Sequence, residues 1–335
     1  MTAPLRIGVA GTSGHANRVA APVIRGSRMA MLAGGAGTDP GRSRDFAARH
    51  GAARAYDGLD AMLADPGVDA VWICSPNHLH AEHVARCAAA GKHVLVEKPL
   101  ATTEAEMEDA AAAAERAGVM LRVGFQHRFR PAHLMLRRML ADETVGRIGF
   151  LRIHRFWSWP YFPGLDPSGP PEWRRHRATS GGWVINDIGS HLLDLMLWLS
   201  DAPGVFAGGL LASQAFDFET EDSTAVLVRL GANGIGVIET SNANQTAGSR
   251  IEVCGARGWI RAEDTLTGAG VLTTHDGQRH LFDPVGPLDA YALELADFAG
   301  AVAGTPGAGA DARAGLAVSR IIAAAVLDGS RASFR

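Results

Sequence analysis

A lysine stands at the end of a predicted buried strand in the segment VLVEKPLATTEAE. The apolar residues 94–96 are followed at once by Glu97, Lys98 and Pro99. In an open parallel sheet, ligands bind beyond the carboxyl ends of the strands, so an ammonium group here would stand beside a bound molecule. There Lys98 can stabilise negative charge that develops on a reacting oxygen. The alternative is structural, an ion pair between Glu97 and Lys98 that caps the strand.

A second set of reactive side chains lies on a predicted helix over residues 182–199. Asp187, His191, Asp194 and Trp198 are spaced i, i+4, i+7 and i+11, which places them on one helical face. An amphipathic helix with one solvated face would explain this pattern. The rest of the helix is so apolar, however, that an aspartate and a histidine one turn apart favour a proton-transfer pair, in which the carboxylate orients the imidazole.

A glycine-containing turn, RIGVAGTSGHA, follows the first predicted strand and opens the first predicted helix. Its first glycine fits a dinucleotide-binding G-x-G-x-x-G pattern, but serine and alanine occupy the second and third positions. Because that serine carries a Cβ where none is preferred, we expect the loop to use the next glycine instead. The alternative interpretation is an ordinary turn that binds no ligand. The candidate pyrophosphate-binding residues are Gly11, Thr12, Ser13, Gly14, His15 and Ala16.

The residues after the second predicted strand bear on the choice between NAD and NADP. An acidic residue at this place normally binds the ribose diol of NAD. In GAGTDPGRSR, Gly37 and Thr38 stand there instead, with Arg42 and Arg44 close behind, which favours NADP. Asp39 would bind the diol if the register were shifted by two residues, and Arg42 also suits a solvated first helical turn. Both cofactors therefore stay open.

A segment rich in proline, aromatic residues and arginine lies between the predicted strand FLRIHRFWSW and the helix over 182–199. It is either a surface loop or a loop that contacts the substrate. In the second case its aromatic rings would stack on a sugar face, and its arginines would bind hydroxyls or a carboxylate. The candidates are Trp157, Trp159, Tyr161, Trp173, Arg174 and Arg177.

The segment NHLHAEH contains His78, His80 and His83. His80 and His83 are spaced i, i+3 on a predicted helix, which is compatible with a metal site. No carboxylate or cysteine cluster accompanies them in the sequence, so we predict no metal.

Composition places the chain among ordinary globular proteins. Its 335 residues are 47% hydrophobic and 20% charged, with a formal net charge of −3, and the length predicts two domains. This balance gives no electrostatic reason to expect nucleic acid or an anionic membrane as partner, so we expect a small molecule. The apolar run LRIGVAG is too short for a signal or a membrane span. Three irregularly spaced cysteines, Cys74, Cys87 and Cys254, indicate reduced thiols in a cytoplasmic protein.

The first third of the chain alternates short apolar runs with helical patterns. The predicted strands are LRIGVA, MAMLAGGA, DAVWICS, HVLVE and VMLRVGF, and the predicted helices span residues 16–25, 42–50, 80–90 and 103–117. Such alternation is typical of βαβ units in an α/β domain with a doubly wound parallel sheet. We predict a Rossmann domain over residues 1–123.

Beyond residue 146 the strands become longer and alternate with period two. FLRIHRFWSW, STAVLVRL, GIGVIETS, SRIEVCG and GWIRAE predict a large, mostly antiparallel open sheet, and helices are predicted over 182–199, 289–303 and 311–327. We therefore predict an α+β domain over residues 124–335. An open sheet with an apolar face needs cover, which predicts a homodimer or tetramer formed through this sheet.

Four segments together resemble the Gfo/Idh/MocA oxidoreductase family. They are SPNHLHAEHV at 75–84, EKP at 97–99, VGFQHRFRP at 123–131 and GGWVINDIGSHLLDLMLWL at 181–199. The resemblance covers nearly the whole chain, in order and with family-like spacing. It implies a nicotinamide-dependent dehydrogenase with a Rossmann domain and a second domain that binds substrate.

The resemblance also implies roles for particular residues. Lys98 hydrogen-bonds the reacting oxygen, His191 removes the hydroxyl proton as general base, and Asp187 orients His191. The bond between Lys98 and Pro99 is expected to be cis. The residues implied to line the cofactor are Ser75, Pro76, Asn77, His80, Glu97, Lys98 and Gln126. Those predicted to contact the substrate are Lys98, Arg128, Trp157, Trp173, Arg174, Asp187 and His191.

The predicted reaction is oxidation of a secondary alcohol on a sugar, polyol or cyclic diol, or reduction of the corresponding ketone. Sugar ketoreductases of the family commonly carry tyrosine where this chain has His191, which favours oxidation. Two alternatives stay open. An NAD-dependent glycosidase would turn over an aryl glycoside without accumulating reduced cofactor. A non-catalytic cofactor-binding regulator would have no need of Lys98, Asp187 and His191.

Overall fold

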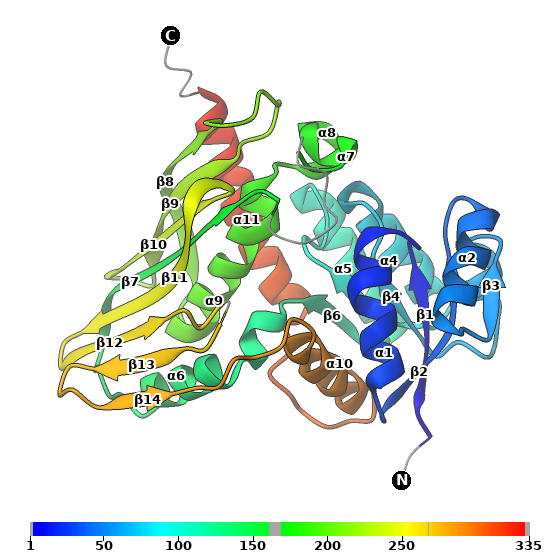
Figure 1. The fold of residues 1–335 in the computed structure, drawn as a ribbon, viewed down its shortest axis with the longest axis horizontal. Helices are drawn as coiled ribbons and strands as arrows, with labels where there is room; N and C mark the ends of the chain where they lie inside the picture. Colours follow the sequence, from blue (N-terminus) through cyan, green and yellow to red (C-terminus); the bar gives the residue numbers. More distant parts are fainter. Residues whose placement is uncertain (1–2, 161–168, 267, 332–335) are drawn as a thin grey trace. The chain divides into compact units, whose positions relative to one another are not determined.

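The computed structural model describes residues 3–160, 169–266 and 268–331. The chain forms two compact units (Figure 1). The first contains Met1–Gln126 and Gly286–Leu316, and the second contains His127–Val285 and Ala317–Arg335. The sequence analysis assigned residues 286–316 to the second domain. They belong to the first unit because helix α10 (Asp289–Val302) packs against helix α1 (Ala21–Gly26) and strand β2.

The first unit is built on a six-stranded parallel sheet with the order β3-β2-β1-β4-β5-β6. Its strands are β1 (Leu5–Ala10), β2 (Ala30–Ala36), β3 (Arg54–Tyr56), β4 (Ala70–Ile73), β5 (His93–Glu97) and β6 (Leu121–Gly124). The strand order reverses between β1 and β4, so the carboxyl ends of these two strands border the crevice in which open α/β sheets bind ligands. The predicted doubly wound parallel sheet is confirmed.

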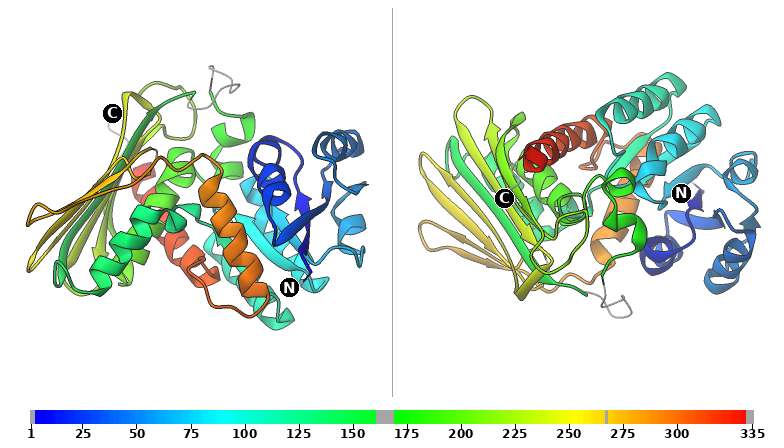
Figure 2. Two further views of the ribbon diagram at one scale, coloured as in Figure 1. Left: turned by 60° about the horizontal axis from the view of Figure 1, so that its bottom comes forward. Right: turned by 90° about the horizontal axis from the view of Figure 1, so that it is seen from above.

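Helices lie on both faces of this sheet (Figure 2). They are the π-helical turn η1 (Ala16–Ala20), α1, α2 (Pro40–His50), α3 (Leu59–Leu63), the 3-10 turn η2 (Asn77–Leu79), α4 (His80–Ala89), α5 (Glu104–Ala117) and α10. Local sequence explains where α5 begins and ends. Thr103 accepts from the Glu106 amide at 3.3 Å, the Glu106 carboxylate accepts from the Thr103 amide at 3.1 Å, and Gly118 ends the helix in a left-handed conformation.

The core of the first unit includes strand residues such as Ile7, Trp72 and Leu95. Helix α10 contributes Leu295 and Phe298 to the same cluster. Strand β4 is buried at all four positions, as expected for a central strand covered on both faces. Strand β5 lies next to it, so the residues that follow both strands start from a rigid base.

The second unit is built on an eight-stranded sheet with the order β14-β13-β12-β11-β7-β10-β9-β8. Its strands are β7 (Ile148–Ser158), β8 (Gly204–Ala212), β9 (Ser223–Leu230), β10 (Gly234–Ser241), β11 (Ala243–Gly255), β12 (Gly258–Glu263), β13 (Val271–Thr274) and β14 (Arg279–Leu281). Among the described strands of this sheet, only β7 and β10 pair in parallel, so the predicted mostly antiparallel sheet is confirmed.

The two faces of this sheet differ. Leu151 and Ile153 of β7 are buried, whereas the alternate residue Phe150 is 38% exposed. Helices of the second unit cover the buried face (Figures 1 and 2). They are α6 (Pro131–Ala141), the π-helical turn η4 (Ile185–Gly189), α9 (Ser190–Ser200) and the end of α11 (Ala312–Arg331). The short helices α7 (Glu172–Arg175) and α8 (Arg177–Ser180) belong to the same unit.

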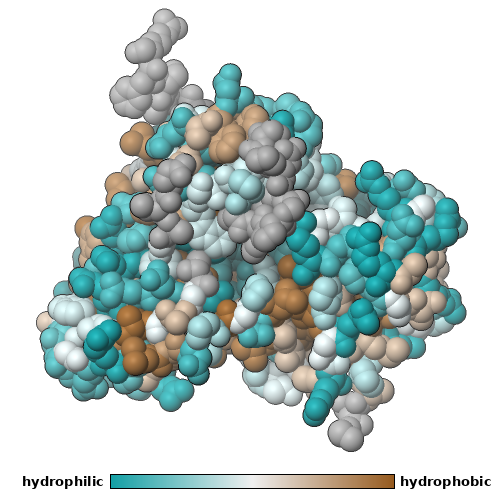
Figure 3. Space-filling model, in the orientation of Figure 1, coloured by the Kyte–Doolittle hydropathy of each residue, from teal (hydrophilic) through white to brown (hydrophobic). Residues whose placement is uncertain are grey.

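Within the described ranges, no helix combines the length and apolar character required to span a bilayer. Most of the surface visible in the space-filling view is hydrophilic, with small apolar patches between the polar residues (Figure 3).

Candidate active site

The predicted site residues are divided between the two units, and each group is described within its own unit. In the first unit, the glycine loop follows β1. Gly11 has a φ of +92°, and a Cβ at this position would come within 2.9 Å of the Cys74 carbonyl and the Ser75 amide. Only glycine allows this close approach between the loop and the end of β4.

Ser13 stands in place of the second glycine of the pattern, and the next residue is Gly14. Gly14 has a positive φ of 24°, whereas Ser13 is exposed and has no such conformation. Ala16 is completely buried at the start of η1, which has no acidic residue in its first turn. The Thr12 carbonyl accepts a hydrogen bond from the Asn17 side chain at 2.8 Å. The amides at this helix start thus remain in an environment suited to a phosphate.

The end of β2 presents no carboxylate. The strand ends at Ala36, and Thr38 and Arg42 are exposed. Asp39 is the N-cap of α2, where its Oδ1 accepts from the Gly41 amide at 2.7 Å. The carboxylate considered as an alternative ribose ligand therefore has a structural role in the helix cap.

Glu97 is buried at the end of β5 and has two polar neighbours. His15 Nε2 lies 3.0 Å from its Oε1, and Trp72 donates to the same oxygen at 3.2 Å. Burial alone raises the pKa of Glu97, but His15, Lys98 and Trp72 stabilise the carboxylate more strongly, so its pKa lies below the ordinary value. The glycine loop is thus joined to the strand that precedes Lys98.

The histidines of the NHLHAEH segment hold the loop after β4. His80 is 1% exposed, with Nδ1 2.6 Å from the Pro99 carbonyl and Nε2 2.8 Å from the Ser75 carbonyl. His83 Nδ1 lies 3.1 Å from the Ser75 hydroxyl. The predicted cofactor residue His80 therefore directs both ring nitrogens to the backbone of its own unit. The Lys98–Pro99 bond is cis, as the resemblance implied.

Tyr291 of α10 is a residue that the sequence analysis missed. Its hydroxyl accepts from Gln126 Nε2 at 2.8 Å, and its ring makes an edge contact with His15 at 5.5 Å between centroids. It thus joins two residues predicted to line the cofactor. The sequence gave little sign of this contact, because Tyr291 follows Gln126 by 165 positions. Tyr291 also lies in an Ala-rich helix that the sequence analysis assigned to the other domain.

In the second unit, His191 occupies the first turn of α9 and is 6% exposed. Its ring makes an edge contact with His127 at 4.8 Å between centroids. Arg130 Nε donates to His127 Nδ1 at 3.2 Å, and Arg155 Nη1 lies 3.2 Å from Nε2. Burial, together with His191 and these arginines, lowers the pKa of His127 well below its ordinary value, so a neutral ring lies beside the predicted base.

Asp187 lies in the π-helical turn η4 and not in a regular α-helix as predicted. Its Oδ2 pairs with Arg174 Nη1 at 2.7 Å. The guanidinium of Arg174 also lies 5.0 Å from the centre of the Trp173 ring. The structure therefore joins the predicted orienting carboxylate to two predicted substrate residues. Orientation of His191 by Asp187 stays a prediction.

Arg128 has a different environment from the one predicted for a substrate residue. It forms a two-point ion pair with Asp194, through Nε at 2.8 Å and Nη2 at 2.5 Å, and both side chains are buried. Burial raises the pKa of Asp194, and Arg128 opposes that shift. The geometry indicates that Arg128 fixes helix α9, because this charge pair would be costly to break.

The aromatic residues predicted to contact a substrate lie in several environments. Trp157 stacks on the Arg155 guanidinium, with 3.7 Å from Cζ to the ring centre. Trp159 contacts Trp183 at 5.6 Å between centroids. Arg177 Nη1 lies 3.8 Å from Glu221. Tyr161 lies outside the described residues.

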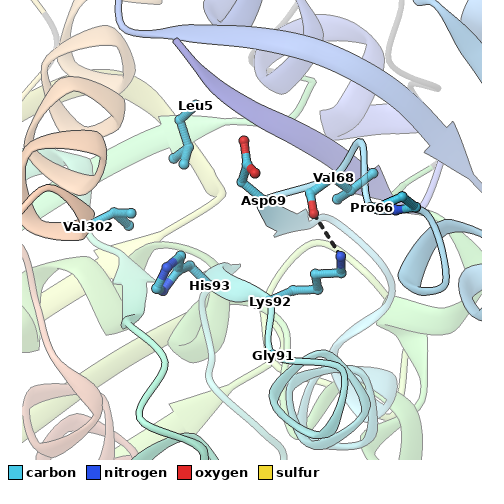
Figure 4. Close-up of a pocket in the computed structure, with 8 residues that line it drawn as sticks. All are labelled: Leu5, Pro66, Val68, Asp69, Gly91, Lys92, His93 and Val302. Carbon is cyan, nitrogen blue, oxygen red and sulfur yellow. Dashed lines mark hydrogen bonds between the residues drawn. The ribbon is translucent and has the colours of Figure 1, made fainter. Parts of the chain in front are cut away.

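Two further features bear on alternative sites. Among the described residues, no group of three or more His, Cys, Asp or Glu side chains could hold a metal ion. A cavity of about 390 Å³ is lined by Leu5, Pro66, Val68, Asp69, Gly91, Lys92, His93 and Val302 (Figure 4). It lies where strands β1 and β5 begin, and Lys92 donates to the Val68 carbonyl at 2.8 Å. This is the end of the sheet opposite to the expected ligand crevice.

Comparison with known proteins identifies the family. Residues 5–125 match the oxidoreductase family with an NAD-binding Rossmann fold, and residues 133–261 match the GFO/IDH/MocA C-terminal domain. The chain belongs to the Gfo/Idh/MocA oxidoreductase family. As a member of this family it is an NAD(P)-dependent oxidoreductase.

Three similar proteins illustrate the relationship. The chain is 32% identical to myo-inositol 2-dehydrogenase of Thermotoga maritima, over 71% of this chain and 69% of that protein. It is 29% identical to 1,5-anhydro-D-fructose reductase of Ensifer adhaerens, over 80% and 79% of the respective chains. The crystal structure of GenD2 from gentamicin A biosynthesis, in complex with NAD, is 25% identical, with a TM-score of 0.84 over 98% of this chain and 95% of that one.

Proposed function

We propose that this enzyme oxidises a secondary alcohol of a sugar, polyol or cyclic diol, or reduces the corresponding ketone. The observation that carries the proposal is the occurrence, in one chain of this family, of Lys98 at the carboxyl end of β5 and of a buried His191 at the start of α9. A hydride transfer from a carbinol carbon requires a base for the hydroxyl proton and a positive charge beside the oxygen.

The first unit fits a dinucleotide. The Gly11 turn allows close approach of a pyrophosphate to the backbone, and the start of η1 offers amides without a competing acidic side chain. When bound, the nicotinamide accepts or donates the hydride. The residues that would hold this cofactor are Gly11, Thr12, Ser13, Gly14, His15, Ala16, Ser75, Pro76, Asn77, Glu97 and Gln126.

We assign the cofactor preference to NADP. The supporting observation is that Thr38 and Arg42 are exposed after β2, whereas the nearby carboxylate of Asp39 accepts hydrogen bonds in the cap of α2. A neutral residue followed by an arginine suits the 2′-phosphate of NADP.

In the proposed reaction Lys98 donates a hydrogen bond to the substrate oxygen and stabilises its developing charge. His191 takes the hydroxyl proton, which is why a neutral imidazole is needed at the start of the reaction. The ring of His127, whose pKa is lowered chiefly by burial, lies 4.8 Å from the ring of His191 between centroids. Asp187, paired with Arg174, would then orient the base.

The substrate class rests on the relatives and on the residues around His191. Related proteins act on myo-inositol and on 1,5-anhydro-D-fructose, which are small polyhydroxylated rings. Trp157 and Trp173 would supply flat apolar surfaces for such a ring, and Arg174 would bind its hydroxyl groups.

A homo-oligomer formed through the second sheet is part of the proposal. Large apolar side chains are exposed on its strands: Phe150, Val205, Leu210, Leu227, Ile235 and Trp259, each between 36% and 56%. Phe150 and Ile235 are direct neighbours across the β7–β10 pair, so their side chains share one face. A second copy of the chain would cover this surface.

The proposed function is tested with inositols, 1,5-anhydro sugars and cyclic diols, each assayed with NAD and with NADP. The absorbance of the reduced nicotinamide measures turnover. We expect oxidation of at least one polyol and faster turnover with NADP. Hydrolysis of an aryl glycoside without net cofactor reduction, or the absence of both binding and turnover, would contradict the proposal.

A further inference from the structure

The loop after β4 and the loop after β5 are joined by one imidazole. Strands β4 and β5 are parallel neighbours, so their carboxyl ends lie side by side. His80, the first residue of α4, faces the carbonyl of Ser75 in one loop and the carbonyl of Pro99 in the other, at 2.8 and 2.6 Å.

Both partners of the ring are hydrogen-bond acceptors. A neutral histidine has one donating ring nitrogen and a protonated histidine has two. Burial, the largest effect, lowers the pKa of His80 below its ordinary value, although the two carbonyls and Glu97 oppose that shift. The ring is 1% exposed, so water cannot replace either contact without opening the loops.

These two loops bear different parts of the proposed chemistry. Ser75 belongs to the segment that would line the cofactor, and its hydroxyl is also held by His83 at 3.1 Å. Pro99 directly follows Lys98. A side chain that fixes both carbonyls sets the distance between the cofactor loop and the backbone that carries the ammonium group.

We propose that His80 is a positioning residue that clamps the Ser75 loop to the Lys98–Pro99 turn. The proposal builds on the proposed function, because the clamp matters for turnover only if Lys98 acts on substrate beside a bound cofactor. Both ring nitrogens of His80 face backbone carbonyls. His80 would affect the reaction by holding the carbonyls of Ser75 and Pro99 in place.

Three substitutions separate the two contacts. The amide nitrogen of Asn lies close to the Nδ1 position of histidine, so His80→Asn keeps a donor for Pro99 and loses the donor for Ser75. The amide nitrogen of Gln lies close to the Nε2 position, so His80→Gln keeps the Ser75 contact and loses the Pro99 contact. His80→Phe keeps a ring and loses both donors.

The first measurement is hydrogen–deuterium exchange of the ligand-free protein, which depends on neither activity nor cofactor. We expect at least tenfold faster exchange over residues 97–102 in the Gln variant, over residues 74–79 in the Asn variant, and over both in the Phe variant. Identical exchange patterns in all three variants, or no change in any of them, would overturn the clamp.

The second measurement separates kcat from cofactor affinity, using NADPH fluorescence for the dissociation constant. The Gln variant should lose at least tenfold in kcat and keep its NADPH affinity within threefold. The Asn variant should show the reverse, and Phe should lose both. Equal losses in the Gln and Asn variants would show a merely structural role. If the exchange pattern appears but the wild-type protein binds no nicotinamide cofactor, the proposed function fails and the clamp stands.

His93→Phe is the matched control. His93 begins the same strand β5 at its opposite end, where Nδ1 accepts from the Met120 amide at 3.0 Å. Its loss should lower the melting temperature while leaving exchange over residues 74–79 and 97–102, kcat and NADPH affinity within twofold of wild type. A kcat loss equal to that of His80→Gln would show that any buried histidine on β5 or α4 has this effect, and the specific clamp would be rejected.

Discussion

His80 in the first unit and His133 in the second are both buried, and each has a ring nitrogen facing a backbone carbonyl. The other nitrogen distinguishes them. In His80 it faces a second carbonyl, that of Ser75 at 2.8 Å, whereas in His133 it faces the hydroxyl of Thr265 at 3.0 Å. A hydroxyl can donate to a neutral imidazole and a carbonyl cannot. The two buried rings thus differ in whether the second neighbour can donate to a neutral imidazole.

The two units also differ in the groups that hold their predicted site elements in place. The first unit holds its predicted site loops largely through backbone groups, at Gly11, Ser75 and Pro99. The second unit holds its site helix through side chains, with the Arg128–Asp194 pair as the main example. Backbone anchors tolerate changes of nearby side-chain type, while paired buried charges depend on both partners being present.

The largest expected effect tests whether the two units contribute equally to turnover. Lys98→Ala and His191→Ala should each lower kcat by about 1,000-fold, because one removes the charge beside the oxygen and the other removes the base. Circular dichroism should show an unchanged fold. If either variant keeps wild-type turnover, the substituted residue does not have the role proposed for it.

The next largest effect concerns stability. Arg128→Met leaves Asp194 buried without its guanidinium partner, and we expect a loss of about 3–5 kcal/mol in the free energy of unfolding. The measurement is urea denaturation at pH 7.

The double variant Arg128→Met, Asp194→Leu is the control for this prediction. It removes both charges and should recover most of the lost stability. If it stays as unstable as the single variant, the cost comes from packing of the arginine stem and not from an uncompensated carboxylate.

The pH dependence of stability sharpens the comparison of the two histidines. The pKa of His133 is lowered to about 4, chiefly by burial, against an ordinary value of 6.5. The unfolded chain therefore takes up the proton first as the pH falls, and stability present above pH 6.5 is lost between pH 6.5 and 4. The expected loss in the free energy of unfolding is about 3 kcal/mol.

His133→Asn keeps the contact with the His127 carbonyl and cannot titrate. Its stability should fall less than that of wild type between pH 6.5 and 4, as measured by urea denaturation at several pH values. Burial also lowers the pKa of His80, so His80→Asn should flatten the pH dependence in the same direction. An unchanged pH dependence in His133→Asn would contradict the lowered pKa of His133.

The smallest expected effect is on cofactor choice. Thr38→Asp adds a carboxylate after β2, which should shift the ratio of kcat/KM for NADP over NAD about tenfold toward NAD. Arg42→Ala should shift the ratio in the same direction by a smaller factor. A ratio that does not change in Thr38→Asp would place the 2′ position of the ribose elsewhere.

Periodicity predicted most of the regular elements but not all of them. Apolar runs predicted strands β1, β2, β4, β5 and β6 of the first sheet and β7, β9, β10, β11 and β12 of the second. Strand β8, strand β13 and helix α6 were missed. The three-residue strands β3 and β14 were also missed, because so few residues carry no measurable period. The π-helical turns η1 and η4 were predicted as ordinary helix, since they place apolar residues similarly.

The sequence by itself determined which residues carry reactive groups and on which predicted strand or helix they lie. Lys98 follows a predicted parallel strand, and His191 lies on the helix predicted over residues 182–199. Only the structure placed His191 in the first turn of α9, after the π-helical turn η4. The tertiary structure alone decided their partners: the Ser75 and Pro99 carbonyls for His80, Asp194 for Arg128, and Tyr291 for Gln126. These partners lie up to 165 positions apart in the chain. Packing selects them from many groups of the same chemical type, and no local pattern encodes that selection.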